Sequence, residues 1–280
     1  MLCRILKVSR SGYYAWRKRT PCPRDSSNAA LLTIIREVHE RSRSTYGSPR
    51  IHAELHEDYG LRCSRKRVAR LMRLAGIVGV HRRKGTRRLG APHSIFEDLV
   101  GRNFSPAAPN KLWVADITQH HTFEGWLYLA AVLDCYSRKV GGWAMAERAD
   151  AELVLSAVRM AMHNRRPETG VIHHSDQGTH YTSLRFGKQL EASGIFGSMG
   201  RVGSAGDNAV MESFFATLQT ELLDSQAWRM RAQLQTAIFD FIEVFYNRER
   251  RHSYLGYLCP VEFERRGPFS TGSAKLETVH

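Results

Sequence analysis

Hydrophobic positions in the first third of the chain recur with a helical period. Residues 28–42 place apolar side chains on one face, and Ser48, the expected N-cap of a second helix, precedes apolar residues at every fourth position up to Tyr59. Ser64 is expected to cap a third helix, which Gly76 ends. Two short helices across a tight turn, the second rich in arginine, are typical of a helix-turn-helix module.

From about residue 109 the pattern changes to short apolar runs separated by turn residues. The first three runs predict an antiparallel meander, after which strands and helices alternate. The expected elements are strands over 112–118, 126–133 and 139–146, a helix over 151–164, a strand over 171–174, a helix over 182–193, a strand over 195–199, and helices from about 208 and over 230–247. This order predicts an α/β fold with a five-stranded mixed sheet flanked by helices.

The two patterns, with the residues between them, divide the chain into segments. Proline-rich and basic stretches mark the boundaries. The expected segments are a short N-terminal helix and linker over 1–27, a helix-turn-helix module over 28–80, a basic and proline-containing linker over 81–108, an α/β core over 109–265 and a C-terminal tail over 266–280.

Charge is concentrated in the all-α part. The chain of 280 residues has a net charge of +14; residues 1–90 hold 22 Lys or Arg against 6 Asp or Glu, a net +16, whereas residues 91–280 hold 19 against 21, a net −2. A basic module joined to a near-neutral one is typical of a nucleic-acid-binding arm on a working domain. A generally basic surface without a ligand is the alternative.

Several function classes are excluded by the same composition. The longest apolar run, residues 126–133, is too short to cross a membrane, and the N-terminus lacks a signal-peptide pattern. The five cysteines are spread widely and form no C-x-x-C pair, which argues against a disulfide framework or a zinc ribbon. We therefore expect a protein of the reducing cytoplasm with no membrane partner.

Three carboxylates follow this framework. Asp116 is expected at the end of the first strand, Asp176 directly after the fourth, and Glu212 near the start of a helix. If the first and fourth strands are neighbours, the two aspartates lie side by side, and like charges that close require a neutralising cation. An all-oxygen cluster suits Mg²⁺ or Mn²⁺, and two such ions about 4 Å apart can support in-line phosphoryl transfer.

The helix that carries Glu212 has its own pattern. Asp207 or Asn208 can cap its first turn by accepting backbone N–H bonds. One apolar stripe is predicted beside Glu212, formed by Met211, Phe215, Leu218 and Leu222. Glu212 is therefore expected at the edge of a core, facing outward.

Other residues leave alternatives open. Histidines near both aspartates allow a zinc site, although no Cys or H-x-x-x-H spacing accompanies them. Asp134 could be a fourth ligand, but its turn, LDCYSRK, favours a structural role. Arg250 and Arg251 could bind DNA or pair with helix carboxylates.

The three acidic blocks, WVADIT, HSDQGTHY and GDNAVMESFFATLQTEL, resemble those of the transposases of the IS-three family of insertion sequences, specifically their second-reading-frame product. The helix-turn-helix stretch from Tyr46 and the motif YNRERRHSYLGYLCPVEFE are also similar to the family, so the resemblance covers nearly the whole chain. It implies a ribonuclease-H-like integrase core and a metal-binding catalytic triad of Asp116, Asp176 and Glu212, using Mg²⁺ or Mn²⁺, two ions being expected.

The resemblance implies a function: metal-dependent cleavage of DNA 3′ ends and strand transfer of an insertion element. The implied partners are double-stranded DNA at the element ends and target, further copies of the chain on that DNA, and an upstream-frame protein or a frameshift fusion with it. The expected location is the nucleoid of a bacterial cytoplasm. Two other functions are possible. A DNA-binding regulator would explain the basic residues 1–90 but not the acids, and a plain ribonuclease-H-type nuclease would explain only the three acids.

One position departs from the family pattern. Family members usually carry Lys or Arg seven positions after the glutamate, where this chain has Gln219, which can hydrogen-bond DNA but supplies no charge. DNA contacts are expected from Arg65, Lys66, Arg67, Arg70, Arg73, Arg82, Arg83, Lys84, Gln219, Arg250 and Arg251.

Overall fold

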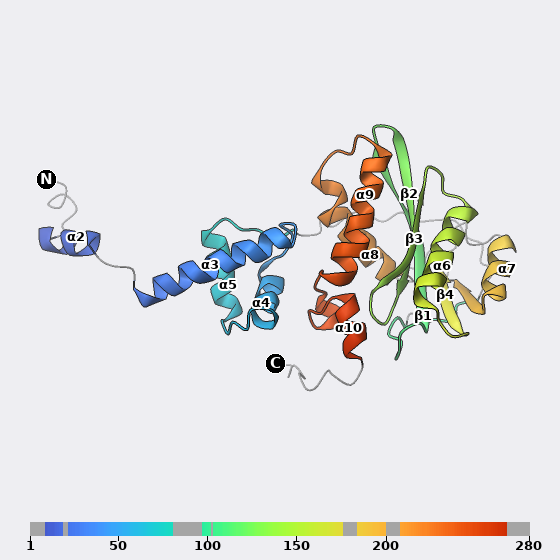
Figure 1. The fold of residues 1–280 in the computed structure, drawn as a ribbon, viewed down its shortest axis with the longest axis horizontal. Coiled ribbons are helices and arrows are strands. Elements are labelled where there is room, and N and C mark those ends of the chain that lie inside the picture. Colours follow the sequence, from blue (N-terminus) through green and yellow to red (C-terminus); the bar gives the residue numbers. More distant parts are fainter. Residues whose placement is uncertain are drawn as a thin grey trace. The chain divides into compact units, whose positions relative to one another are not determined.

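The chain folds into two compact units, Met1–Val80 and His81–His280 (Figure 1). This computed structural model describes residues 9–18, 22–80, 97–101, 103–175, 184–199 and 208–267. Within that part of the chain, none of the helices combines the length and the apolar character that crossing a bilayer requires.

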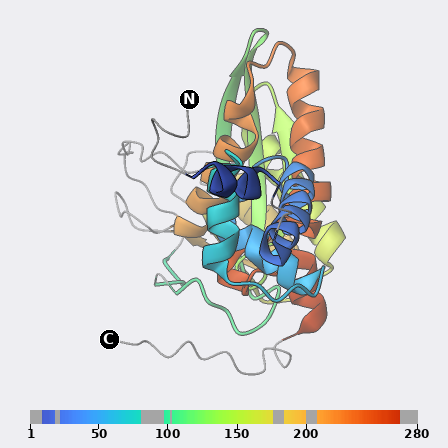
Figure 2. The ribbon, with the colours of Figure 1, turned by 90° about the vertical axis from the view of Figure 1, so that its left-hand side faces the viewer.

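The first unit is helical. Helices α3 (Pro23–Arg41), α4 (Ser48–Glu57) and α5 (Arg65–Leu74) contact one another, and the shorter α2 (Arg10–Arg17) precedes them. Figure 2 views these helices from the left-hand side of Figure 1. Each of the three contributes one apolar face to a shared core, made of Leu31, Ile35, Val38, Tyr46, Ile51, Leu55, Val68, Leu71 and Met72. The all-α prediction for this part is confirmed.

The helix starts differ in detail from the prediction. Helix α3 begins at Pro23, inside the segment expected to be a linker, because proline is well suited to a first helical turn. The prediction of Ser48 as an N-cap is wrong: Ser48 is the first residue of α4, and Gly47 is its cap. The cap at Ser64 is confirmed, since its Oγ accepts the backbone N–H three residues later at 3.3 Å.

The second unit is built on a five-stranded sheet in the order β3-β2-β1-β4-β5. The first three strands pair antiparallel, whereas β4 pairs parallel with both β1 and β5. The strands are β1 (Leu112–Thr122), β2 (Gly125–Asp134), β3 (Val140–Ala146), β4 (Val171–Ser175) and β5 (Ile195–Met199). The predicted mixed sheet is confirmed.

Helices cover both faces of this sheet (Figure 1). Helix α6 (Ala151–Arg165) packs on β2 and β3 and contacts α7 (Leu184–Ala192), while α8 (Ala209–Glu221) contacts β1 and α9 (Arg231–Asp240) contacts β2. Helix α6 lies so close to β3 that a Cβ at Gly142 would meet a carbonyl oxygen of the helix at 2.2 Å. A glycine is therefore required where these two elements cross.

Two elements differ from the sequence-based expectation. Strand β1 does not end at Asp116 but runs on to Thr122, because β2 continues to pair with it as far as Gly125. The helix predicted over 230–247 is α9 followed by a π-helical segment, Phe241–Tyr246. A short helix, α10 (Pro260–Arg266), completes the described part of the unit.

The buried stripe of α8 also needs a correction. Met211, Leu218 and Leu222 are buried as predicted, but the fourth buried side chain is Phe214, not Phe215. Phe214 packs edge-on against Tyr246 of the π-helical segment, with ring centroids 4.9 Å apart. Phe214 therefore takes the place of Phe215 in the buried stripe, and Glu212 is exposed beside it.

Candidate active site

Asp116 directly follows the last described residue pair between β1 and β4. The last pair of this parallel ladder is Ala115 with Ser175, so Asp116 is the first residue of β1 beyond it, while its other neighbour, β2, still pairs through Ala131. The Asp116 side chain is partly buried, and its Oδ1 accepts the backbone N–H of Ile117 at 2.7 Å. The carboxylate thus directly follows the described pairing of β1 with β4.

Asp176, the second predicted acid, lies outside the described residues. It follows Ser175 directly in the sequence, and Ser175 is the last residue of β4. The expected neighbouring of the first and fourth strands is confirmed, with four residue pairs in register from Leu112 with Ile172 onward.

Glu212, the third predicted acid, is in the first turn of α8 and is exposed. The start of this helix is attached to β1, because Asn208 Nδ2 donates to the carbonyl oxygen of Ala115 at 3.1 Å. The expectation that Asn208 caps the helix with its side chain is wrong: no side-chain cap bond forms, and the amide is used for the contact with the strand. Asp207, the other predicted cap, is outside the described residues.

Ala115 is therefore the residue at which β4, the start of α8 and Asp116 come together. It pairs with the last residue of β4, it accepts a hydrogen bond from the cap residue of α8, and Asp116 follows it in β1. Glu212 is one helical turn beyond Asn208, and its N–H donates to the Asn208 carbonyl at 3.0 Å. Two carboxylates thus belong to elements that meet at one backbone position.

The oxygen atoms gathered here suit a hard divalent cation. Carboxylate and amide oxygens are the ligands that Mg²⁺ and Mn²⁺ prefer. The described residues, which do not include Asp176, contain no group of three His, Cys, Asp or Glu side chains that could by itself hold a metal ion. The donor type fits these ions, and the third carboxylate would have to come from outside the described ranges.

The histidines of β4 are packed in the core. His174 Nδ1 lies 2.9 Å from Ser198 Oγ, and the ring packs edge-on against Phe104. Burial lowers the pKa of His173 to about 4. In the described part of the chain these rings belong to no cluster of metal-binding side chains, so the zinc alternative gains no support.

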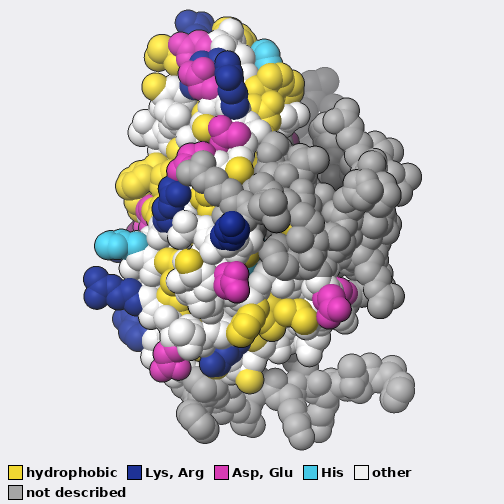
Figure 3. All heavy atoms as spheres, turned by 90° about the vertical axis from the view of Figure 1, so that its right-hand side faces the viewer, with side chains coloured by type: hydrophobic (Ala, Val, Ile, Leu, Met, Phe, Trp, Pro, Cys, Tyr) yellow, Lys and Arg dark blue, Asp and Glu magenta, His cyan; other side chains and the backbone are white. Residues whose placement is uncertain are grey.

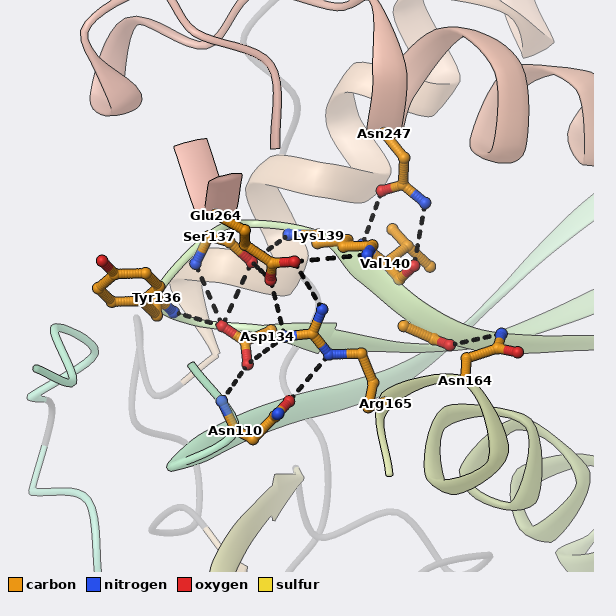
Figure 4. Close-up of polar contacts among 11 residues, drawn as sticks. Asn110, Asp134, Tyr136, Ser137, Lys139, Val140, Asn164, Arg165, Asn247 and Glu264 are labelled. Atoms are coloured by element: carbon orange, nitrogen blue, oxygen red, sulfur yellow. Dashed lines mark hydrogen bonds and ion pairs between the residues drawn. The ribbon is translucent and has the colours of Figure 1, made fainter. Parts of the chain in front are cut away.

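Asp134 is the centre of a polar network near the start of β1 (Figure 4). Its carboxylate accepts backbone N–H bonds from Asn110 at 2.6 Å, from Tyr136 at 2.9 Å and from Ser137 at 3.1 Å. Arg165 of α6 lies 3.4 Å from the same carboxylate. Asp134 thus connects the start of β1, the turn after β2 and α6, which is the structural role that its turn predicted.

Glu264 of α10 is the second acid of this network. Arg165 Nη2 lies 2.7 Å from its carboxylate, and Lys139 Nζ lies 3.4 Å away. Burial raises the pKa of Asp134, and its hydrogen bonds and Arg165 offset this only in part. Burial also acts to raise the pKa of Glu264, but the hydrogen bonds and charge of Arg165 outweigh it and the pKa is lowered. The network fastens α10 to the sheet.

The predicted DNA-binding arginines at the C-terminal side have internal partners. Arg250 is buried and makes two hydrogen bonds of 2.7 Å to Glu221, the last residue of α8. Arg251 is buried too and donates to the carbonyl oxygen of Tyr257 at 2.9 Å. The alternative that Arg250 pairs with a helix carboxylate is therefore the one the structure contains. Gln219 is partly exposed and donates to Asp224 at 2.5 Å.

The basic residues of α5 divide into two groups. Arg65, Lys66 and Arg73 are exposed. Arg67 instead donates to Asn28 at 2.9 Å and to Ser27 at 2.8 Å, which fastens α5 to α3. Arg70 is partly buried, and Arg82, Arg83 and Lys84 lie outside the described residues.

The described surface of the second unit is mixed in charge. On the face shown in Figure 3, basic and acidic side chains lie among hydrophobic ones. This agrees with the near-neutral net charge of residues 91–280.

Two features of this region are not predicted by the sequence: the bond from Asn208 to Ala115 and the network around Arg165. The dipeptide Asp207-Asn208 before the acidic helix indicates only a possible cap. Both features depend on contacts between residues far apart in the chain, 93 positions in the case of Asn208 and Ala115.

Comparison with known families matches both units. Residues 26–85 match the family described as HTH-like domain, and residues 106–205 and 193–260 match two families described as Integrase core domain. Together with the sheet order and the flanking helices, these matches define an integrase core that follows a helix-turn-helix-like domain.

Relatives that match over nearly their whole length identify the family within this class. The chain is 40% identical over 267 residues to the insertion element IS600 uncharacterized 31 kDa protein of Shigella sonnei, covering 95% of this chain and 98% of the relative. It is 37% identical over 271 residues to the transposase InsF for insertion sequence IS3A of Escherichia coli K12, covering 95% and 93%. The chain therefore belongs to the IS3-family transposases.

Solved structures with a similar fold are more distant. A chain in the cryo-EM structure of a simian T-cell lymphotropic virus intasome is 16% identical with a TM-score of 0.48, covering 81% of this chain and 80% of that one. The HTLV-2 integrase catalytic core domain, determined in complex with magnesium, is also 16% identical, with a TM-score of 0.41 over 56% of this chain and 97% of that one.

Proposed function

We propose that Asp116, Asp176 and Glu212 form one metal-dependent centre that cleaves and joins DNA at the ends of an insertion element. The observation that carries the proposal is the convergence at Ala115: Asp116 follows it in β1, its pair Ser175 is followed in sequence by Asp176, and the helix of Glu212 is bonded to it. Membership of the IS3-family transposases supports the same chemistry.

In this proposal the three carboxylates hold Mg²⁺ or Mn²⁺, as two ions. When bound, such ions make an attacking oxygen more nucleophilic and stabilise the oxygen that leaves in an in-line displacement. The chain contributes the ligands and their placement. Asp116 is fixed by the sheet and Glu212 by a helix attached to that sheet, so the two ligands keep their separation while DNA binds and leaves.

The reaction is two successive displacements at phosphorus. In the first, a water oxygen attacks a phosphodiester at the element end, the bond to the 3′ oxygen breaks, and that oxygen takes up a proton to become a free 3′-OH. In the second, the 3′-OH attacks another phosphodiester and loses its proton, a new P–O bond forms, and the 3′ oxygen of the attacked strand leaves. One phosphodiester replaces another, so the joining step needs no external energy source.

DNA contacts in this proposal come first from the exposed cations of α5, Arg65, Lys66 and Arg73. Arg82, Arg83 and Lys84 extend the basic run, and Gln219, two turns beyond Glu212 on its helix, contacts the terminal nucleotide. Neutralised phosphates release counterions, so the logarithm of the binding constant should fall with the logarithm of salt concentration, with a slope of about −0.9 for each phosphate that the protein neutralises. Fluorescence anisotropy of a labelled duplex at several salt concentrations measures this slope.

Two element ends must be held at once during joining, so we expect a dimer or larger complex on DNA, in the nucleoid of a bacterial cytoplasm. An upstream-frame protein, or a fusion with it, would be a further partner in recognising the ends. Light scattering of the protein with paired end duplexes tests the assembly; one chain per pair of ends would contradict it.

Product analysis separates this function from its rivals. The purified chain is incubated with labelled duplexes copied from the two DNA flanks of its reading frame, with Mg²⁺ or without metal. A transposase gives cut and joined strands only with the metal, and the Glu212→Gln variant gives neither. Cutting without joining would indicate a plain nuclease, and binding with neither product would indicate a regulator; both results contradict the proposal.

A further inference from the structure

Asn208 occupies an unusual position for the cap residue of a helix. A cap asparagine normally turns its side chain inward to accept an N–H of the first helical turn, which stabilises the helix. In α8 this bond is not made, and the side chain reaches β1 instead, where Nδ2 donates to Ala115 at 3.1 Å. The helix thus gives up a local stabilising bond for a contact with the strand that carries Asp116.

The orientation of this amide follows from its partner. The Ala115 carbonyl can only accept a hydrogen bond, so the NH₂ group of Asn208 must face it, and the amide oxygen lies on the other side. That oxygen is buried and accepts no hydrogen bond from the part of the chain that the structure describes. Asn208 as a whole is only 9% exposed.

A buried acceptor that finds no donor in the described part of the chain calls for an explanation, because leaving such a group unsatisfied destabilises the fold. Asn208 joins the start of α8, which carries Glu212, to β1, which carries Asp116, so a donor that enters with the metal would satisfy its amide oxygen. Water molecules that remain on Mg²⁺ or Mn²⁺ are such donors, since these ions usually keep several waters when protein carboxylates bind them.

We propose that Asn208 is a positioning residue of the catalytic centre. Its side-chain NH₂ group sets the separation of Glu212 from Asp116 by fastening the start of α8 to β1, and its amide oxygen would serve as an acceptor for a water that a bound Mg²⁺ or Mn²⁺ keeps. This inference rests on the proposed metal centre. The inference goes beyond the three acids, because it assigns to a neutral residue the role of fixing the relative positions of Asp116 and Glu212.

The two ends of α8 offer an internal comparison. Asn208 fastens the first end, and Arg250 fastens the last residue, Glu221, through two bonds of 2.7 Å. With a rise of 1.5 Å per residue, Glu212 lies about 6 Å along the axis from Asn208 and about 14 Å from Glu221. The nearer attachment therefore has the greater effect on the Glu212 carboxylate.

Two substitutions separate positioning from stability. Asn208→Ala removes both groups of the amide. Asn208→Ser cannot reach Ala115, but serine is a good N-cap and can restore the missing bond within the first turn, so this variant keeps α8 stable. Leu218→Ala is the matched control, because Leu218 is fully buried in the same helix and its loss lowers stability without touching the contact with β1.

The measurement is the Mn²⁺ response of the full-length protein without DNA, read as the rise of its thermal midpoint during a titration. We expect Asn208→Ala and Asn208→Ser to raise the half-saturating Mn²⁺ concentration by tenfold or more, a typical effect of losing a group that orients metal ligands. Leu218→Ala should lower the midpoint in the absence of metal and leave the half-saturating concentration unchanged.

The possible results test the role of Asn208 separately from the proposed metal centre. If both Asn208 variants respond to Mn²⁺ as the wild type does while Asp116→Asn does not respond, the metal centre stands and the role of Asn208 is wrong. If Asp116→Asn responds like the wild type, the metal centre itself is wrong. If Leu218→Ala shifts the half-saturating concentration as far as Asn208→Ser, the effect is one of stability, which also overturns the inference.

Discussion

Asp116 and Asp134 lie on paired strands of one sheet, yet their surroundings give them different roles. Asp134 is fully enclosed, with backbone N–H donors and Arg165 around its carboxylate. Asp116 is partly exposed and directly follows the last described pair between β1 and β4. An enclosed carboxylate with such partners serves the fold, whereas a partly exposed one can still take a ligand.

His173 gives a prediction at the same scale. Burial lowers its pKa from 6.5 to about 4, so between these values the unfolded chain binds a proton that the folded chain does not. Stability is then complete above pH 6.5 and is lost as pH falls toward 4, by roughly 3 kcal/mol for this residue. Urea unfolding at pH 7.5, 5.5 and 4.5 measures the loss.

The control for this prediction is His173→Gln, which has no proton to bind in this range. The variant should be less stable than the wild type at pH 7.5 because a buried ring is replaced, but its stability should fall less between pH 6.5 and 4. Equal pH dependence in the two proteins would show that His173 is not the source of the loss.

At the scale of elements, α8 is the part on which the site depends most. Its first end is bonded to β1 through Asn208, its middle packs on Tyr246 through Phe214, and its last residue is paired with Arg250. Asn247, in the same C-terminal segment as Arg250, makes two bonds of 3.0 Å to the backbone of Val140 in β3. The segment that contains Asn247 and Arg250 therefore connects β3, an edge strand of the sheet, to α8.

The pair of Arg250 and Glu221 is expected to be important for stability, because its side chains are only 5% and 7% exposed. Arg250→Met leaves a buried carboxylate without its cation and should lower the free energy of unfolding by about 3–5 kcal/mol. The double variant Arg250→Met with Glu221→Met should recover part of that loss, since no buried charge remains. Denaturant unfolding of the three proteins measures both effects.

A matched exposed pair provides the comparison. Arg159 and Glu152 of α6 are joined at 2.5 Å, but both side chains are 49% exposed. Arg159→Met should therefore cost no more than about 1 kcal/mol. A loss for Arg250→Met as small as that for Arg159→Met would contradict the structural role assigned to Arg250.

The sequence allowed most elements of the α/β unit to be predicted, because its strands are short apolar runs between turn residues. It misplaced the end of β1, since residues after Thr118 are polar and the pairing that continues the strand comes from β2. It also missed the π-helical turn, because one extra residue in a turn hardly alters an apolar pattern. Asn208 could not be assigned, since its partner is 93 positions away.

The candidate site was predictable to a different extent. The sequence did not establish that β1 and β4 are neighbours; it indicated only that the two aspartates would lie close together if they were. The structure shows that the two strands are paired. The sequence could not distinguish Arg67 and Arg250 from DNA-binding arginines, because it does not show whether an arginine contacts a phosphate or a buried acceptor within the protein. Their partners, Asn28 and Glu221, became visible only in three dimensions.

At the scale of the whole molecule, the proposed function assigns two tasks, DNA binding and DNA chemistry, to different parts of the chain. A basic helical unit with exposed cations on α5 precedes a near-neutral unit that carries the acids. DNA affinity and DNA chemistry should therefore respond to different substitutions. Losing one of the three acids should leave duplex binding near the wild-type level, because the proposed phosphate contacts come from α5 and the basic run that follows it, residues 82–84.

Asp176 provides the most direct test of the account, because it is the acid that the three-carboxylate proposal requires next to Ser175. Full-length Asp176→Asn is compared with the wild type for duplex binding by anisotropy and for strand joining with Mg²⁺ or Mn²⁺. The account predicts unchanged binding and joining below detection with either metal. Strand joining retained by Asp176→Asn would contradict it.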